Sequence, residues 1–405
     1  MLSSRSNVGY YKTGNKLFTE KIEAVIEANK TKADVEWEFN NDIWDAVDWT
    51  VEPTLSLNEL YKLRAQQIRD KYDYLVLFSS GGSDSRNMAY AFLKNGIHLD
   101  EIVAGSPASG LNNWNNDLTS HNPENTITET VVAQMPFMHE ISVNYPNVKL
   151  TNHDYFIDMV NYKPDEWIRK CGNYIHPTYA ARYNLERYSH LKKILDSGKT
   201  IGFIYGIDKP FITIHKGMVW SLIYDYGVSN AFQSIDHPLA DVELFYWSHE
   251  LPEIVIKQSH VVTKAAHVPE NVHSIMDTIH NDSRENYKEI YSKHSARYQR
   301  AIIPYIYPML EEFPWQCAKP ALVFMGEHDA WFDKLHKGTI VHQKIMSDYD
   351  RFIKSIDPKY FRTRQQNWDI EVDEHSHLDP NYVIGFKPCM LKKKIGPVSN
   401  FLPKL

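Results

Sequence analysis

Short apolar segments alternate with helix-like segments between residues 74 and 206, and this alternation restricts the fold more than any other feature of the chain. The apolar segments are rich in Val, Ile, Leu and Tyr, as strands that are buried on both faces usually are. Strands joined by helices form right-handed crossovers, so the sequence predicts an α/β fold with a parallel twisted sheet and helices on both faces. The expected strands are 74–79, 99–106, 147–155 and 199–206, and the expected helices are 84–96, 126–141 and 179–198.

The segments on either side of this alternation look different, and they suggest three regions. Residues 1–72 are expected to be a helical N-terminal region, and residues 73–215 the α/β domain. Residues 216–405 are expected to be a mainly helical region. In the N-terminal region, Ser56 followed by Glu59 matches a capping box at the start of a helix. The residues expected on the apolar face of that helix are Leu57, Leu60, Leu63 and Ile68.

Composition is consistent with a folded protein and narrows its class. The chain has 405 residues, of which 43% are hydrophobic and 13% aromatic, enough for one large core or two ordinary ones. The net charge of −7 gives no general reason to bind nucleic acid. Its three cysteines form no C-x-x-C pair, which fits a reducing compartment. With no apolar leader and no long apolar run, the chain is expected to be soluble and cytoplasmic, without a membrane partner.

A cluster of serine and glycine residues lies between the first strand and the first helix of the alternation, in the sequence "LFSSGGSDSRNMAY". Gly81 and Gly82 can adopt backbone angles that bring their N–H groups together at one point. The following helix directs its own N-terminal N–H groups and the positive end of its dipole to the same place. Ser80, Ser83 and Ser85 add hydroxyl groups, so the segment is suited to hold a phosphate.

Two common phosphate-binding motifs are absent, whereas a third is present. No lysine follows the cluster as a Walker A loop requires, and no G-x-G-x-x-G occurs. Residues 80–85 read S-G-G-x-D-S, and here the chain resembles the N-type ATP pyrophosphatases, or PP-loop superfamily, which includes the synthetase domain of asparagine synthetase. The resemblance covers about residues 72–212. It implies cleavage of ATP to AMP and pyrophosphate, with Mg²⁺ as cofactor.

The resemblance also implies roles for individual residues. The pyrophosphate portion of ATP would be held by Ser80, Gly81, Gly82, Ser83 and Ser85. Asp84 would orient the loop or help to hold Mg²⁺. The adenine would lie against backbone groups at the end of the second strand, formed by Val103, Ala104 and Gly105.

Two further segments resemble the family less closely. "AARYN" (180–184) is similar to a segment that contributes an arginine to the phosphates, which would make Arg182 a catalytic residue. "YGIDKP" (205–210) follows the fourth strand, so Gly206 would line the nucleotide, Asp208 bind Mg²⁺ and Lys209 contact the phosphates. The alternatives are a surface arginine on a helix and an ordinary turn before Pro210.

Other features of the family are missing. No cysteine stands near the start of the chain as the nucleophile of a glutaminase half, so nitrogen is expected to come directly or from a partner. Cys171 and Cys389 do not match the cysteine motifs of the sulfur-transfer members. Asp373, His375 and His377 form a possible metal-binding segment. No H-E-x-x-H motif and no further ligand at a suitable spacing accompany it, which favours solvated or hydrogen-bonded histidines. The polar group formed by Lys257, Gln258 and His260 is a candidate lining of an acceptor pocket.

These observations lead to one functional hypothesis and two alternatives. The chain is expected to be an ATP-dependent, ligase-like enzyme that activates an acceptor oxygen as its AMP derivative, for amide or C–N bond formation. One alternative is an enzyme that modifies a nucleotide, a nucleobase or tRNA, and the other is a non-catalytic ATP-binding regulator. The partners expected are ATP and an acceptor that the sequence does not identify.

Overall fold

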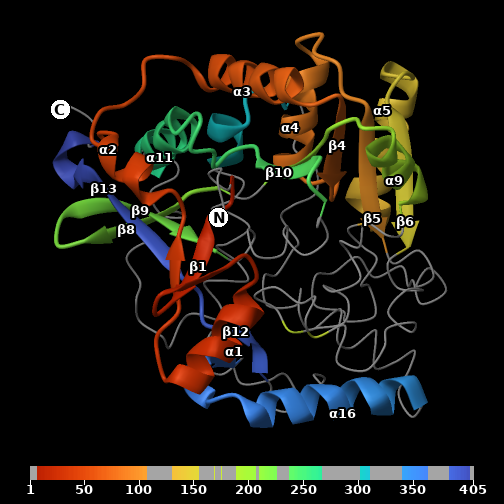
Figure 1. The fold of residues 1–405 in the computed structure, drawn as a ribbon. Helices are drawn as coiled ribbons and strands as arrows, with labels where there is room; N and C mark the ends of the chain where they lie inside the picture. Colours follow the sequence, from red (N-terminus) through yellow and green to blue (C-terminus); the bar gives the residue numbers. More distant parts are fainter. Residues whose placement is uncertain are drawn as a thin grey trace.

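The computed structural model describes most of the chain and contains one parallel sheet together with three smaller sheets (Figure 1). The described residues are 7–106, 130–154, 168, 175, 188–206, 209–225, 237–266, 302–310, 340–363 and 383–401.

The parallel sheet has five strands, in the spatial order β10-β7-β4-β5-β6, and every neighbouring pair is parallel. Its strands are β4 (Tyr74–Ser79), β5 (Glu101–Ser106), β6 (Lys149–Asp154), β7 (Ile201–Tyr205) and β10 (Ala240–Leu244). The four strands predicted from the sequence are confirmed. The fifth, β10, comes from the region that was expected to be mainly helical.

Helices cover both faces of this sheet, which confirms the predicted α/β architecture. On one face α4 (Ser83–Leu93) packs against α5 (Met135–Asn144), where the rings of Tyr90 and Phe137 meet edge to face. A π-helical turn, η2 (Thr130–Gln134), leads into α5. On the other face lies α9 (Ser189–Asp196); Tyr188, which precedes it, meets Phe78 of β4 edge to face.

The N-terminal region was expected to be helical, but it also contains an antiparallel sheet. Tyr11 and Trp37 pair across this sheet and both are buried. Strands of three or four residues are too short to show an alternating pattern, so the sequence reading missed them. The elements of the region are β1 (Tyr10–Thr13), β2 (Lys16–Phe18), α1 (Lys21–Thr31), β3 (Glu36–Glu38), α2 (Asn41–Ala46) and α3 (Leu57–Lys71).

The start of α3 confirms the predicted capping box. The Ser56 hydroxyl accepts a hydrogen bond from the Glu59 amide, and the Glu59 carboxylate accepts one from the Ser56 amide. The expected apolar face is wrong at one position, because Leu63 is exposed. The buried stripe passes through Arg64 instead, whose side chain is inaccessible to solvent.

The described parts of the region after residue 215 contain several strands besides their helices, and the expectation of a mainly helical region did not include these strands. Val219, Ser221 and Ile223 alternate along one strand and face the core, a period of two that indicates a strand. Strand β8 (Phe211–His215) ends at this boundary, and the further elements after it are β9 (Met218–Tyr224), α11 (Glu253–Ala266), α16 (Ile340–Ser355), η6 (Pro358–Tyr360), β11 (Phe361–Thr363), β12 (Val383–Phe386), β13 (Met390–Pro397) and η7 (Val398–Asn400). Strands β8, β9 and β13 form an antiparallel sheet, on the left in Figure 1.

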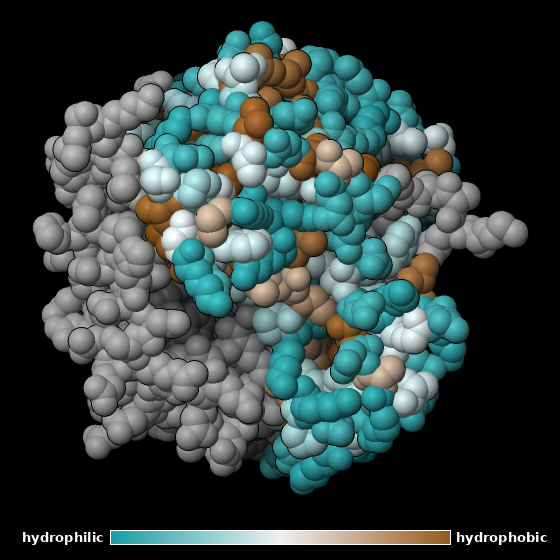
Figure 2. Space-filling model, turned by 90° about the vertical axis from the view of Figure 1, so that its left-hand side faces the viewer, coloured by the Kyte–Doolittle hydropathy of each residue, from teal (hydrophilic) through white to brown (hydrophobic). Residues whose placement is uncertain are grey.

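One hydrophobic core connects the three expected regions. It includes Trp44 before α3, Leu77 in β4 and Ile395 in β13, all of which are fully or almost fully buried. The expected boundaries near residues 72 and 215 therefore do not separate independent cores among the described residues. Figure 2 shows the side of the molecule on which β8 lies, where apolar side chains are exposed among hydrophilic ones.

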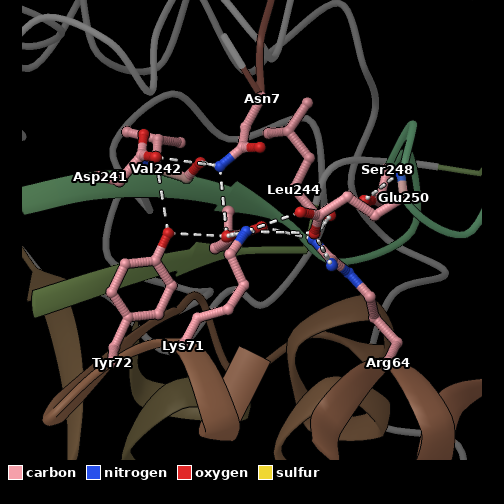
Figure 3. Close-up of polar contacts among 10 residues, drawn as sticks. Asn7, Arg64, Lys71, Tyr72, Asp241, Val242, Leu244, Ser248 and Glu250 are labelled. Carbon is pink, nitrogen blue, oxygen red and sulfur yellow. Dashed lines mark hydrogen bonds and ion pairs between the residues drawn. The ribbon is translucent and has the colours of Figure 1, made fainter. Parts of the chain in front are cut away.

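A buried charged cluster fastens α3 to β10 and to the segment that follows it (Figure 3). The Arg64 guanidinium lies 2.5 Å from Glu243 and 2.9 Å from Glu250, and Lys71 contacts the same two carboxylates at 2.6 and 2.9 Å. Although burial disfavours the charged ammonium, the two glutamates raise the pKa of Lys71. A buried carboxylate is stable only when it is paired in this way. The cluster explains how the sheet gains an edge strand from the C-terminal half.

Candidate functional site

The Ser80–Ser85 loop connects the carboxyl end of β4 to the start of α4. The Gly81 amide donates to the Ser79 hydroxyl at 3.0 Å, and the Gly82 amide donates to the Ser80 hydroxyl at 3.4 Å. Gly81 has a φ of +74°, in the left-handed region. A Cβ atom at this position would lie 2.5 Å from the Cα atom of Gln134. Both the backbone angle and the close approach of η2 therefore require glycine here.

The N-terminus of α4 has the features of an anion site. The amide groups in the first turn of a helix have no carbonyl partner within it. In α4 no capping side chain accepts from them either. Ser85 donates its hydroxyl to the Gly82 carbonyl at 3.1 Å. The Ser83 hydroxyl, in contrast, is buried and has no hydrogen-bond partner. A buried polar atom without a partner is costly, and a bound ligand oxygen would relieve that cost.

Lys209 and Asp84 connect the loops that follow β7 and β4. The Lys209 ammonium lies 2.8 and 2.9 Å from the two carboxylate oxygens of Asp84, and both side chains are largely buried. The Tyr307 hydroxyl also donates to this carboxylate, and the Tyr246 hydroxyl donates to the Asp84 backbone carbonyl at 2.7 Å. Burial, and then the Asp84 carboxylate, raise the pKa of Tyr307 well above its usual value. The phenol therefore stays protonated and acts as a donor.

Two residues that the sequence reading missed hold the loop from behind. The Arg86 guanidinium donates to the Gly81 carbonyl at 2.9 Å and to the Ala133 carbonyl at 3.2 Å. The Gln134 side-chain amide donates to the Ser79 and Gly105 carbonyls, both at 3.1 Å, and so joins the ends of β4 and β5. Arg86 directly follows the motif and was therefore within reach of sequence reasoning. Gln134 lies far along the chain, and no sequence signal connects it to the loop.

Some of the other predicted site residues lie at the same sheet edge as the loop, and two lie outside the described residues. Val103 and Ala104 are buried in β5 beside Phe78 and Ser79 of β4, and Gly105 ends that strand at the same sheet edge as the loop. Gly206 follows β7, and a Cβ atom there would lie 3.5 Å from the Asp84 backbone carbonyl oxygen. These residues are therefore brought together at one edge. Arg182 and Asp208 lie outside the described residues.

A metal centre made from protein side chains alone is not found in the described part of the chain, where no group of three or more His, Cys, Asp or Glu residues could hold an ion. The Ser80–Ser85 loop provides one carboxylate, that of Asp84, which is in contact with Lys209. Mg²⁺ often keeps its water ligands and needs one or two carboxylates plus substrate phosphates, so this donor set fits an ion that arrives with a nucleotide. Asp373, His375 and His377 lie outside the described residues.

The polar side chains of α11 serve a different purpose from the one expected. Lys257 donates to the Pro53 carbonyl at 3.0 Å, and Gln258 donates to the Tyr61 hydroxyl at 2.9 Å. The His260 ring lies 2.9 Å from the Trp49 carbonyl. All three side chains fasten α11 to the N-terminal region and so hold the fold together; the Gln258 side-chain oxygen is buried and has no hydrogen-bond partner.

The strand order places the loop at a topological switch point. From β4 the chain continues to β5 and β6 on one side, and it then crosses to β7 and β10 on the other side. In open parallel sheets, ligands bind outside the carboxyl ends of the strands where the order reverses. The two loops at this point are those that follow β4 and β7, which the Lys209–Asp84 ion pair joins. The fold therefore assigns this edge as the candidate site.

Comparisons of the chain with protein-family models, curated proteins and solved structures find no match. Among the helices that the structure describes, none is both long and apolar enough to cross a lipid bilayer.

Proposed function

We propose that the chain binds ATP at the Ser80–Ser85 loop and, with Mg²⁺, transfers AMP to an acceptor oxygen. The observation that carries this proposal is the buried Ser83 hydroxyl without a partner, at the uncapped N-terminus of α4 and at the switch point of a parallel sheet. An anionic ligand at this position would accept hydrogen bonds from the first-turn amides and from Ser83. The S-G-G-x-D-S motif supports a pyrophosphate group as that anion.

Each residue of the site has a part in the proposed reaction. The α4 amides and the Ser83 hydroxyl bind the pyrophosphate portion, and Lys209 neutralises charge that develops on the leaving group. Asp84 positions Lys209 and offers one carboxylate to Mg²⁺. The ion would neutralise phosphate charge. The backbone at the end of β5, near Gly105, would contact the adenine.

The reaction would proceed in two steps, adenylation of the acceptor and then displacement of AMP. An acceptor oxygen attacks the α-phosphorus of ATP, the bond between the α-phosphorus and the bridging oxygen breaks, and pyrophosphate leaves with the electron pair. An amine or ammonia then attacks the activated acceptor carbon, AMP leaves, and the nitrogen loses a proton. Most of the rate enhancement would come from positioning and from charge neutralisation. This is the chemistry of an AMP-forming ligase. We place the proposed enzyme in the cytoplasm, a reducing compartment.

The test is the identity of the nucleotide products. Purified protein is incubated with ATP, Mg²⁺ and a pool of small metabolites, and the nucleotides are separated by chromatography. AMP and pyrophosphate are expected, with a rate that falls in Ser83→Ala and is unchanged in Ser142→Ala, an exposed serine on α5. ADP and phosphate would overturn the adenylation step. ATP binding that Ser83→Ala weakens, without turnover in any pool, would support the non-catalytic regulator in place of the enzyme.

A further inference from the structure

The antiparallel sheet formed by β8, β9 and β13 has two different faces. On the inner face, Val219 and Ile223 of β9 are fully buried, and the Ser221 hydroxyl lies 3.0 Å from the Ser259 hydroxyl of α11. Successive residues of a strand point to opposite faces, so the residues between these point outward. The cross-strand register places their neighbours from β8 and β13 on the same outer face. The outer face includes Phe211, Trp220, Leu222, Tyr224, Met390, Lys392 and Lys394; of these, Leu222 is buried.

Two large side chains on this outer face are exposed to solvent, and two aromatic rings beside them are partly exposed. Phe211 is 61% exposed and Met390 is 50% exposed. The rings of Phe211 and Tyr224 meet edge to face, with 5.8 Å between their centroids. Trp220 and Tyr224 are partly buried, and the Trp220 indole N–H is itself buried without a hydrogen-bond partner. Solvent-exposed rings grouped in this way require a partner more often than scattered ones do.

The charge on the same face is positive. The Lys392 ammonium lies 4.4 Å from the centroid of the Trp220 ring, and Lys394 pairs directly opposite Trp220 in the sheet. Lys216 is exposed at the turn between β8 and β9. Residues 209–225 and 387–401 contain one acidic residue, Asp225, which is buried and paired with Lys21 at 2.7 Å. These two stretches therefore place lysines, and no carboxylate, on the exposed face.

We propose that this outer face, termed the β8–β9–β13 face, binds single-stranded nucleic acid. Bases would stack on Phe211, Trp220 and Tyr224, and the phosphates would contact Lys392 and Lys394. Open aromatic platforms beside cationic side chains suit unpaired bases with any sequence, because every base has a flat face. A duplex hides those faces inside its stack, so it would meet only the lysines. The net charge of −7 belongs to the whole chain, whereas Lys216, Lys392 and Lys394 make this face locally positive.

The position of the face connects it to the candidate site. Lys209 contacts Asp84 in the site, and Phe211, two residues later, begins the face. A strand bound along β8 would therefore reach the edge of the sheet where ATP is proposed to bind. The binding itself does not depend on the ATP proposal. Ser83→Ala is expected to weaken ATP and to leave nucleic-acid affinity unchanged, so the two proposals fail separately.

The test measures fluorescence anisotropy of a labelled oligonucleotide of about twelve nucleotides, a length within the usual range for such platforms. Phe211→Ala is expected to weaken binding of the single strand by at least about fivefold, the lower limit for one stacked base. Lys392→Ala with Lys394→Ala is expected to reduce the slope of log affinity against log salt by about 1.4, or about 0.7 for each lost phosphate contact. The substituted side chains are exposed, and circular dichroism checks that each variant folds.

Matched controls separate this face from the general surface. Tyr305→Ala removes another exposed aromatic ring, and Lys192→Ala with Lys193→Ala removes two exposed lysines from α9; neither is expected to change the affinity. Any of three results would overturn the proposal: no binding at low salt, equal binding of the duplex, or equal losses in the controls. Binding of a protein segment through Phe211, with no binding of the oligonucleotide, would reassign the face to a protein partner.

Discussion

The Lys209 ammonium contacts both carboxylate oxygens of Asp84, at 2.8 and 2.9 Å, and so joins two loops that lie 125 residues apart in the chain. Asp84 lies in the first turn of α4, after the central strand β4, and Lys209 follows the neighbouring strand β7. The pair lies beside the uncapped N-terminus of α4. A phosphate bound there would contact both the Lys209 ammonium and the free amide groups of the helix.

Replacing Lys209 is therefore expected to weaken nucleotide binding. Lys209→Met should reduce ATP affinity by about tenfold or more, because hydrogen bonds to charged groups contribute about 1.5–3 kcal/mol. Isothermal titration calorimetry measures the affinity, and Lys192→Met on the exposed side of α9 is the control. An unchanged affinity with a lower melting temperature would show that the pair serves stability alone.

Substituting Gly81 should disturb the loop through two separable effects. Gly81→Ala is strained by its φ of +74° and also brings a Cβ atom to 2.5 Å from the Gln134 Cα atom. Gly198→Ala is the matched control, since Gly198 has a φ of +84° and nothing lies within 4 Å of a Cβ atom there. The control should lose about 1–2 kcal/mol of stability, and Gly81→Ala clearly more. Urea unfolding measures both losses, and equal losses would contradict the close approach of η2.

The buried charged cluster predicts unequal effects for its two glutamates. Glu243 is fully buried, whereas the Glu250 side chain is 31% exposed. Glu243→Gln should lower the free energy of unfolding by about 3–5 kcal/mol, because it leaves Arg64 buried with a weakened partner. Glu250→Gln should cost about 1 kcal/mol, as partly exposed pairs do. The two variants are compared by urea unfolding at one pH, and a reversed order would disprove this account of the cluster.

Acid should destabilise the protein through His260. Burial lowers the pKa of this histidine; the hydrogen bond to Trp49 and the Glu52 carboxylate oppose the shift, while Lys264 and Lys257 support it. The unfolded chain binds a proton near pH 6.5 and the folded protein does not, so stability is present above that pH and falls below it. The loss is at most about 1.4 kcal/mol per pH unit for one histidine.

The variant that tests this acid sensitivity is His260→Gln, which removes the titrating ring. Urea unfolding at about pH 7.5, 6.5 and 5.5 should show a shallower decline of stability than in the unaltered protein. His139→Gln, at an exposed position on α5, should leave the decline as it is. Equal slopes in all three proteins would show that other groups cause the decline.

Local patterns allowed much of the parallel sheet to be predicted. The segment 74–79 is apolar except for Ser79 at its end, because β4 lies in the middle of the sheet, with strands on both sides and helices on both faces. The capping box at Ser56 and Glu59 also formed as predicted, since both partners lie within one helical turn. The glycine-rich loop is again local, because Gly81 provides the positive φ that its position requires.

Contacts between distant segments could not be read from the sequence. Arg64 continues the apolar stripe of α3, yet it is buried because Glu243 and Glu250 arrive from the other half of the chain. Strand β10 was missed because its pairing with β7 is long-range and its segment also carries two acids, Asp241 and Glu243.

The sequence by itself therefore determined the central strands, the loop and the helix that follows, because hydrophobic period, capping and backbone freedom act over a few residues. Only the tertiary structure decided that Lys209 meets Asp84, that Gln134 closes over Gly81 and that Phe211 of β8 stays exposed beside β9. Each of these depends on which segments pack together, and packing follows from the shape and charge of surfaces that assemble only when the whole chain folds.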